Sequence, residues 1–331
     1  MLLHWLVLTA LCSAAIIFFG SRLPLLNNTT LTHWDAEWYY RINTMGYYYV
    51  EGQMGTLAFF PLFPFVWKFT LLNSAGISIL NLLIFSVSFF YLARMLKLGL
   101  TSSLLFLSTP SLLFCFLPYS EALFFMSSTI ILIGLHRKNN AMILIGMCLA
   151  AFTRSVNVVL IPALIYTYVC NYGFSVKTIR MVLTATLLVS AAALGVFWIQ
   201  YLHTGQWFAF FKMQKLWHRT LQMPTLPLTT LSTKVLWLDA AALFISTLAL
   251  LDAAAEFIHI MFRKGKAGFS ATAHFSMAYL AIMGFLAVFY SGIWPRQYGS
   301  SIMSLNRFVF AGPYFICYIF NRFQRERTIQ S

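Results

Sequence analysis

The stretch RMVLTATLLVSAAALGVFWIQY, residues 180–201, decides which class of fold to expect. Only its first residue, Arg180, is charged. A helix needs about 20 predominantly apolar residues to cross the hydrocarbon core of a bilayer. This stretch therefore predicts a membrane-spanning helix.

The composition of the whole chain points the same way. Of its 331 residues, 60% are hydrophobic, 18% are aromatic and 9% are charged, and the mean hydropathy is +0.78. Soluble domains carry roughly 25% charged residues. Alternating segments of about ten residues, which a membrane barrel requires, do not recur. We therefore expect an all-α polytopic membrane protein with a single integral membrane domain over residues 1–331.

Polar breaks divide the chain into ten apolar runs. The predicted spans are residues 2–20, 75–93, 100–117, 119–135, 141–153, 156–172, 180–201, 235–262, 272–291 and 306–321.

Basic residues between these spans predict the orientation of the chain. With a cytoplasmic N-terminus, 12 of the 22 Lys and Arg residues fall in short cytoplasmic connections. Because positive residues concentrate on the cytoplasmic side, we expect both termini in the cytoplasm. The outer segments are then residues 21–74, 202–234 and 292–305, and these extracytoplasmic loops are expected to carry the functional site.

The segment THWDAEWYYRI, residues 32–42, places two carboxylates among aromatic side chains in the first outer loop. Thr32 and Asp35 fit a capping box that would start a helix, and Glu37 and Arg41 fit an i,i+4 ion pair. A carboxylate beside stacking aromatics also suits sugar chemistry, because partial burial can tune it as a general base. Asp35 is therefore open to two interpretations, a helix cap or a catalytic base.

Further polar residues at the outer side have similar double interpretations. Glu121 opens a predicted span, where it suits either the helix dipole or a site that faces Asp35. Arg154 interrupts two short apolar runs, where it either snorkels or pairs with an anion such as phosphate. The loop 202–234 mixes cations, amides and indoles, as a site for a phosphate-linked sugar or a solvated loop would. Its candidate binding residues are Lys212, Lys215, Trp217 and Arg219.

Two carboxylates, Asp252 and Glu256, lie inside a predicted span. Their i,i+4 spacing places them on one helix face, as in a proton or cation site of a transporter. Polar residues of a neighbouring helix would explain them equally well.

Several short motifs follow the order found in one known family. His33-Trp34-Asp35 with Trp38-Tyr39 and Gly46-Tyr47 resembles the first luminal loop of the PIG-V family of GPI mannosyltransferases and their bacterial relatives. Residues 58–64 (AFFPLFP), 118–124 (PYSEALF), 154–155 (RS), 203–219 and 306–313 are similar to further segments of that family.

The resemblance implies a GT-C type glycosyltransferase. Such an enzyme moves a hexose, usually mannose, from a polyprenyl-phosphate donor to a lipid or glycan acceptor outside the cytoplasm and inverts the anomeric centre. Asp35 is then the expected general base. The residues expected at the donor phosphate are Glu121, Arg154, Lys212, Lys215, Trp217, Arg219 and Arg307, and those expected to stack on the acceptor or sugar are Trp34, Trp38 and Tyr39.

The expected partners are the lipid-linked donor, the acceptor and membrane lipids. No cofactor or metal is expected, because no DxD motif or His/Cys cluster stands out. The net charge of +14 is assigned to topology and not to a nucleic-acid partner. A bacterial plasma membrane is the expected location, with the endoplasmic reticulum as the alternative. The competing functions are a transporter or flippase of lipid-linked sugars and a scaffold subunit for a partner enzyme.

Overall fold

The computed structural model describes residues 28–230, 233–262, 267–292 and 298–330. The predicted first span, residues 2–20, lies outside these ranges. The described residues form helices, with two isolated β-bridges and no strand. The α-helices are α2 (Asn28–Leu31), α3 (Asp35–Met45), α4 (Leu62–Thr70), α5 (Ser74–Leu96), α6 (Leu100–Leu107), α7 (Glu121–His136), α8 (Asn140–Thr153), α9 (Leu160–Tyr172), α10 (Val176–Thr204), α11 (Ala209–Leu216), α12 (Leu236–Phe262), α13 (Ala271–Phe289), α14 (Leu305–Phe310) and α15 (Pro313–Gln330). Short 3-10 helices occupy Thr56–Ala58, Pro110–Cys115, Ser155–Val159 and Thr233–Val235.

Four of the described helices, α5, α10, α12 and α13, are long and apolar enough to cross a membrane. Two shorter apolar helices, α7 and α8, lie beside them. The expectation of a helical membrane protein is confirmed at this level, and the number of ten spans stays a prediction.

Two predicted spans are not single helices. Residues 100–117 divide into α6 and a 3-10 helix, because Pro110 disfavours a helical conformation at the preceding residue and Thr109 is extended (φ −64°, ψ 122°). Residues 306–321 divide into α14 and α15, and Pro313 is the first residue of α15. Proline suits this position because its missing N–H would be unpaired there in any case. Both predictions of one continuous helix were wrong.

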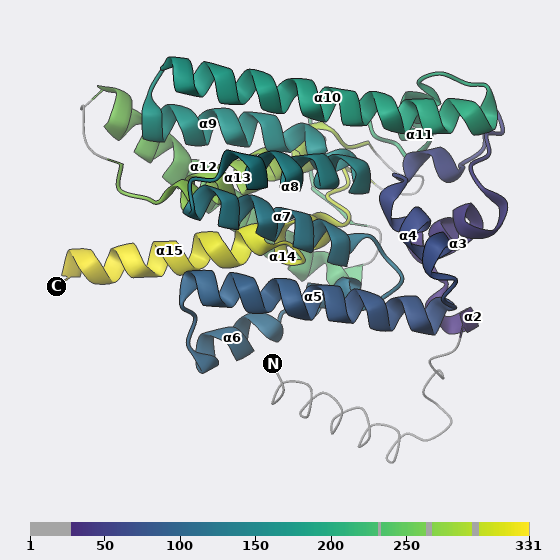
Figure 1. The fold of residues 1–331 in the computed structure, drawn as a ribbon, viewed down its shortest axis with the longest axis horizontal. Coiled ribbons are helices and arrows are strands. Elements are labelled where there is room, and N and C mark those ends of the chain that lie inside the picture. Colours follow the sequence, from purple (N-terminus) through teal and green to yellow (C-terminus); the bar gives the residue numbers. More distant parts are fainter. Residues whose placement is uncertain (1–27, 231–232, 263–266, 293–297, 331) are drawn as a thin grey trace, which may run out of the picture.

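The long helices run side by side along the long axis of the molecule (Figure 1), and α13 lies in the middle of the bundle. Of its most apolar window, 72% is buried, against 33% for α5, 22% for α10 and 28% for α12. The three outer helices therefore expose apolar faces that a soluble protein would bury.

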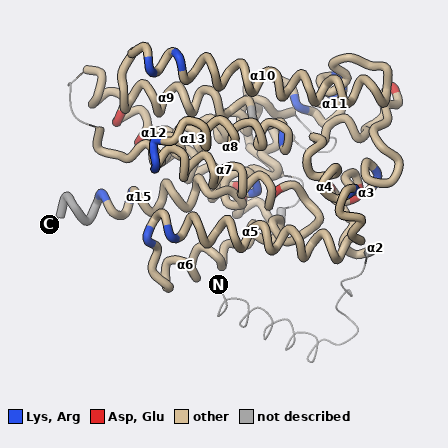
Figure 2. The backbone as a smooth tube through the Cα atoms, in the orientation of Figure 1, with Lys and Arg blue, Asp and Glu red and all other residues tan. Residues whose placement is uncertain are grey.

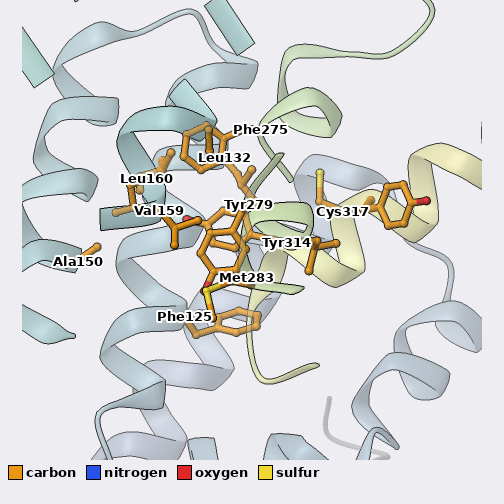
Figure 3. Close-up of a cluster of buried hydrophobic side chains, with 14 of the residues drawn as sticks. Phe125, Leu132, Ala150, Val159, Leu160, Phe275, Tyr279, Met283, Tyr314 and Cys317 are labelled. Carbon is orange, nitrogen blue, oxygen red and sulfur yellow. The ribbon is translucent and has the colours of Figure 1, made fainter. Parts of the chain in front are cut away.

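Aromatic and aliphatic side chains from α7, α13 and α15 fill the centre of the bundle (Figure 3). The rings of Tyr279 and Tyr314 lie 4.1 Å apart, and Phe125 and Phe275 are fully buried around them. A second, smaller core joins α3, α4 and α11 through Tyr39, Phe63 and Met213. This second core attaches the first predicted outer loop to the second.

Most basic residues of the predicted cytoplasmic connections gather at one end of the bundle, which we call the basic end (Figure 2). The opposite end carries α3, α4, α11 and the loops that join them, and we call it the loop end. Within the described ranges, the Lys and Arg residues of the predicted cytoplasmic connections are Arg94, Lys97, Arg137, Lys138, Lys177, Arg180, Arg322 and Arg325.

Candidate active site

The three predicted outer loops meet at the loop end. The second and third loops pair through backbone hydrogen bonds, in which Thr229 N–H donates to the Ser300 carbonyl (2.9 Å) and Ile302 N–H donates to the Thr229 carbonyl (2.9 Å). The first loop is attached to the C-terminal part of α10, where Gln200 Nε2 donates to the carbonyl of Leu57 at 2.9 Å. Segments far apart in the sequence therefore enclose one space.

This space is a cavity of about 160 Å³ between the loops and the ends of α8 and α14. A water molecule needs about 10–15 Å³ of such space, so the cavity has room for a headgroup as large as several waters. Its polar lining consists of Asp35, Tyr39, Thr153, Arg154, Ser155, Gln214, Arg219, Ser304 and Arg307, and its aromatic lining of Phe59, Phe60, Trp217 and Phe308.

Arg307 is the centre of the charged residues here. Its Nη2 atom lies 2.8 Å from Asp35 Oδ2. On its other side, its Nε and Nη2 atoms both contact Glu121 Oε1, with the Nε contact at 2.9 Å. Arg154 Nη1 approaches the same oxygen to 2.6 Å. We call Asp35, Glu121, Arg154, Arg219 and Arg307 the loop-end cluster.

Glu121 anchors this cluster from below the cavity. It is the first residue of α7, and its side chain is only 2% exposed. A carboxylate at that depth needs ionic partners, because desolvation of an unpaired charge is costly. Arg154 and Arg307 supply them, so Glu121 acts through these two guanidinium groups and does not itself line the cavity.

Aromatic rings hold both guanidinium groups in place. The Arg307 guanidinium lies over the rings of Phe114 and Tyr119, at 4.6 and 4.9 Å. The Arg154 guanidinium lies over Phe308 at 4.8 Å. Such cation–π contacts favour one orientation of each guanidinium, so the charges facing the cavity are pre-oriented.

Arg219 reaches the cavity from the second loop. Its Nη2 atom donates to the carbonyl of Met303 at 3.4 Å, and within the described residues it forms no ion pair. Burial lowers the pKa of the Arg219 guanidinium, yet arginine remains protonated in proteins. The loop-end cluster therefore combines three cations with two anions and has a formal net charge of +1.

Asp35 occupies the first position of α3 and its side chain is 28% exposed. The predicted capping box with Thr32 is absent, because no side chain caps α3. The Tyr119 hydroxyl instead holds this turn by donating to the His33 carbonyl at 3.2 Å. Asp35 is thereby left facing the cavity, and the capping interpretation was wrong.

The other carboxylate of this segment, Glu37, pairs with Arg41 as predicted. Both side chains are substantially exposed, at 49% and 39%. Glu37 therefore belongs to the outer surface of α3 and not to the cavity.

The three predicted stacking residues occupy different layers. Tyr39 lines the cavity, and its hydroxyl donates to Ser120 Oγ at 2.8 Å. Trp38 lies behind the lining, where it stacks on Phe59. Trp34 is 69% exposed and is not among the lining residues.

Of the four loop residues predicted near phosphate, the structure brings two to the cavity, Trp217 and Arg219. Lys212 and Lys215 lie on the exposed face of α11, outside the lining. The cavity face of the same helix presents Gln214, which the motifs did not single out.

A buried polar network that sequence reasoning missed positions Arg307. Asp239, fully buried in α12, accepts hydrogen bonds from Asn306 N–H (3.0 Å) and Asn306 Nδ2 (2.6 Å). Thr230 donates to the other oxygen of Asp239 at 2.8 Å, and Ser111 donates to Asn306 Oδ1 at 2.9 Å. These bonds tie the start of α14, and with it Arg307, to α12. In the sequence, the only indication of this network was Asn306 directly before Arg307.

The paired carboxylates of α12 lie at the basic end. Asp252 contacts Arg322 and accepts a hydrogen bond from Tyr318 (2.6 Å). Glu256 contacts Arg325 (3.3 Å) and buried His274 (3.4 Å). The interpretation in which neighbouring helices supply partners is confirmed. We call Asp252, Glu256, His274, Arg322 and Arg325 the basic-end cluster.

Within the ranges that the structure describes, no group of three or more His, Cys, Asp or Glu side chains is arranged to hold a metal ion. No protein-family model, no curated protein and no solved structure matches the chain.

Proposed function

We propose that this protein is an inverting glycosyltransferase of the membrane that moves a hexose, with mannose as the first candidate, from a polyprenyl-phosphate donor to a lipid or glycan acceptor. One observation carries the proposal. Asp35 and the guanidinium groups of Arg154, Arg219 and Arg307 meet at one cavity that three loops enclose.

The reaction needs a base on one side of the sugar and positive charge on the other. Asp35 takes the proton of the acceptor hydroxyl while the acceptor oxygen bonds to the anomeric carbon. The bond from that carbon to the phosphate oxygen breaks, and its electron pair leaves with the polyprenyl phosphate. The guanidinium groups stabilise the charge that develops on this phosphate, as donors placed in advance do in acyl and phosphoryl transfer.

The charge of the cluster supports this donor class. A sugar linked to a lipid through a phosphodiester carries a single negative charge, and the loop-end cluster has a formal net charge of +1. Arginine suits this role because its planar fork binds phosphate oxygens in a bidentate manner. Tyr39, Phe59 and Trp217 add ring faces and edges on which a sugar can stack.

The distribution of charge along the bundle supports an extracytoplasmic site. The basic end collects Lys and Arg from several connections, and such residues concentrate on the cytoplasmic side. The loop end would then face outwards, and we assign the protein to the bacterial plasma membrane on this basis and on the resemblance described above.

The test is transfer of labelled mannose from polyprenyl-phosphate mannose in proteoliposomes that contain the purified chain and a bacterial lipid extract as acceptor. Asp35→Asn should lower the rate by about 10²–10⁴-fold, the range typical of general-base removal. Glu37→Gln is the matched control, since this carboxylate lies on the same helix outside the cavity, and it should retain the rate. Full activity of Asp35→Asn would remove the proposed base.

A further inference from the structure

The contact between Asp35 and Arg307 raises a question for the proposed mechanism. Asp35 Oδ2 is already occupied by Arg307 Nη2 at 2.8 Å. While Oδ2 holds this ion pair, it is not presented to an acceptor hydroxyl, and Oδ1 is the oxygen left to receive a proton. One of the two oxygens of the base is therefore masked in the structure described here.

The two carboxylates around Arg307 hold it unequally. Glu121 is almost completely buried, binds both the Nε and Nη2 atoms of Arg307 and also holds Arg154. Asp35 is 28% exposed and contacts only Nη2. Water can replace a lost partner at Asp35 but not at Glu121. The contact to Asp35 is therefore the one that an incoming ligand can displace.

We propose that a phosphate anion entering the cavity takes Arg307 over from Asp35 and thereby frees Oδ2 of the base. Glu121 keeps Arg307 in place during the exchange, so the guanidinium changes one partner without leaving the site. The ligand chemistry is a phosphate mono- or diester. This inference rests on the proposed function, in which that phosphate belongs to the donor.

The exchange sets an order for the reaction. Oδ2 of Asp35 becomes available only after the phosphate of the donor has bound, so an acceptor hydroxyl that arrives first meets a base with one oxygen engaged by Arg307. A site built in this way favours binding of the donor before proton transfer.

Competition for Arg307 predicts that a substitution in the site strengthens phosphate binding, whereas most site substitutions weaken it. If Asp35 and the phosphate compete for one guanidinium, removal of the Asp35 charge must strengthen phosphate binding. Asp35→Asn should bind polyprenyl phosphate about tenfold more tightly than the wild type, because a nearby like charge has been removed. A residue with a merely structural role would weaken binding when replaced.

The experiment measures the Kd of full-length protein in nanodiscs for a polyprenyl phosphate at fixed ionic strength, with inorganic phosphate as a second arm. Glu37→Gln should leave both Kd values unchanged. Asp35→Ser, which removes the same charge, replaces Asp35→Asn if the latter does not fold.

Each outcome decides between the claims. Unchanged or weaker binding in folded Asp35→Asn and Asp35→Ser overturns the exchange but leaves the proposed function standing. Tighter binding of inorganic phosphate alone supports the exchange and contradicts a lipid-linked donor. Binding of neither anion by the wild type overturns both proposals.

Discussion

The loop-end and basic-end clusters place similar residues at opposite ends of the same helices, yet they are built differently. Asp252 follows Asp239 by 13 positions along α12, which separates the two ends by about 20 Å at 1.5 Å per residue. Each cluster contains two carboxylates, and each carboxylate contacts a guanidinium. The two clusters differ in their charge balance and in whether a cavity lies beside them.

At the basic end, the charges of the carboxylates and guanidinium groups balance, and each carboxylate has several hydrogen-bond or ionic partners. Glu256 accepts hydrogen bonds from the backbone N–H groups of Gly268 and Phe269 in addition to its ionic partners. Asp252 shares one oxygen between Arg322 and Tyr318. This arrangement joins α12 to α15 and to the loop before α13, and it needs no ligand.

At the loop end, the third guanidinium has no carboxylate of its own within the described residues, and the charges border a cavity. A surplus cation beside a cavity suits an anionic ligand. The comparison teaches that buried ion pairs alone do not distinguish the candidate site from the rest of the described protein. The unmatched charge at a cavity is what distinguishes it.

The largest expected effect is a loss of stability on replacement of Glu121. Replacement of Glu121 by Gln leaves the largely buried Arg154 unpaired and Arg307 with Asp35 as its one carboxylate, which should cost about 3–5 kcal/mol of stability. The measurement is thermal unfolding in detergent. Added inorganic phosphate should restore part of the loss, since an anion that binds the native state stabilises it. Asp252→Asn at the basic end should show no such rescue, and equal rescue of both variants would contradict the distinction.

A smaller effect is expected on the Kd for polyprenyl phosphate, where replacement of Arg219 and of Arg322 should differ. Arg219→Gln removes the surplus cation and should weaken binding of polyprenyl phosphate about tenfold, which corresponds to a hydrogen bond to a charged group of about 1.5 kcal/mol. Arg322→Gln, its counterpart at the basic end, should leave the Kd unchanged. A titration of both variants in nanodiscs measures this, and equal losses would show that net charge alone governs binding.

The smallest effect is expected from Lys212 and Lys215. Both are exposed outside the cavity lining, and exposed charges contribute little because solvent and salt screen them. The double variant Lys212→Ala/Lys215→Ala should change the Kd by less than about twofold at physiological ionic strength. A tenfold loss of affinity in the same titration would show that these lysines contribute to phosphate binding.

The sequence predicts the long helices well and the breaks within them poorly. The apolar runs of α10 and α12 are continuous, so hydropathy locates both within a few residues. Hydropathy does not register a backbone break while apolar residues continue, which is why the bends at Pro110 and Pro313 were missed. Proline was the available signal at both places.

In the candidate site, too, some features could be predicted from the sequence and others could not. Asp35 and Arg154 could be nominated because each is a charge in an apolar or aromatic setting, and Arg307 followed from the resemblance of residues 306–313. The contact of Arg307 with Glu121 could not be predicted, since the two residues are 186 positions apart in the chain. The side of α3 that faces the cavity depends on tertiary packing, and therefore Tyr39 lines the cavity and Trp34 does not.

The most direct test of the account compares one neutralised carboxylate from each cluster in the same transfer assay. The rate of mannose transfer from polyprenyl-phosphate mannose is measured in proteoliposomes for Asp35→Asn and Asp252→Asn, normalised to the amount of folded protein. The account predicts a loss of at least about 100-fold for Asp35→Asn and a near wild-type rate for Asp252→Asn. Loss of function on Asp252→Asn with an active Asp35→Asn would contradict it and would favour a transporter that uses the carboxylates of α12.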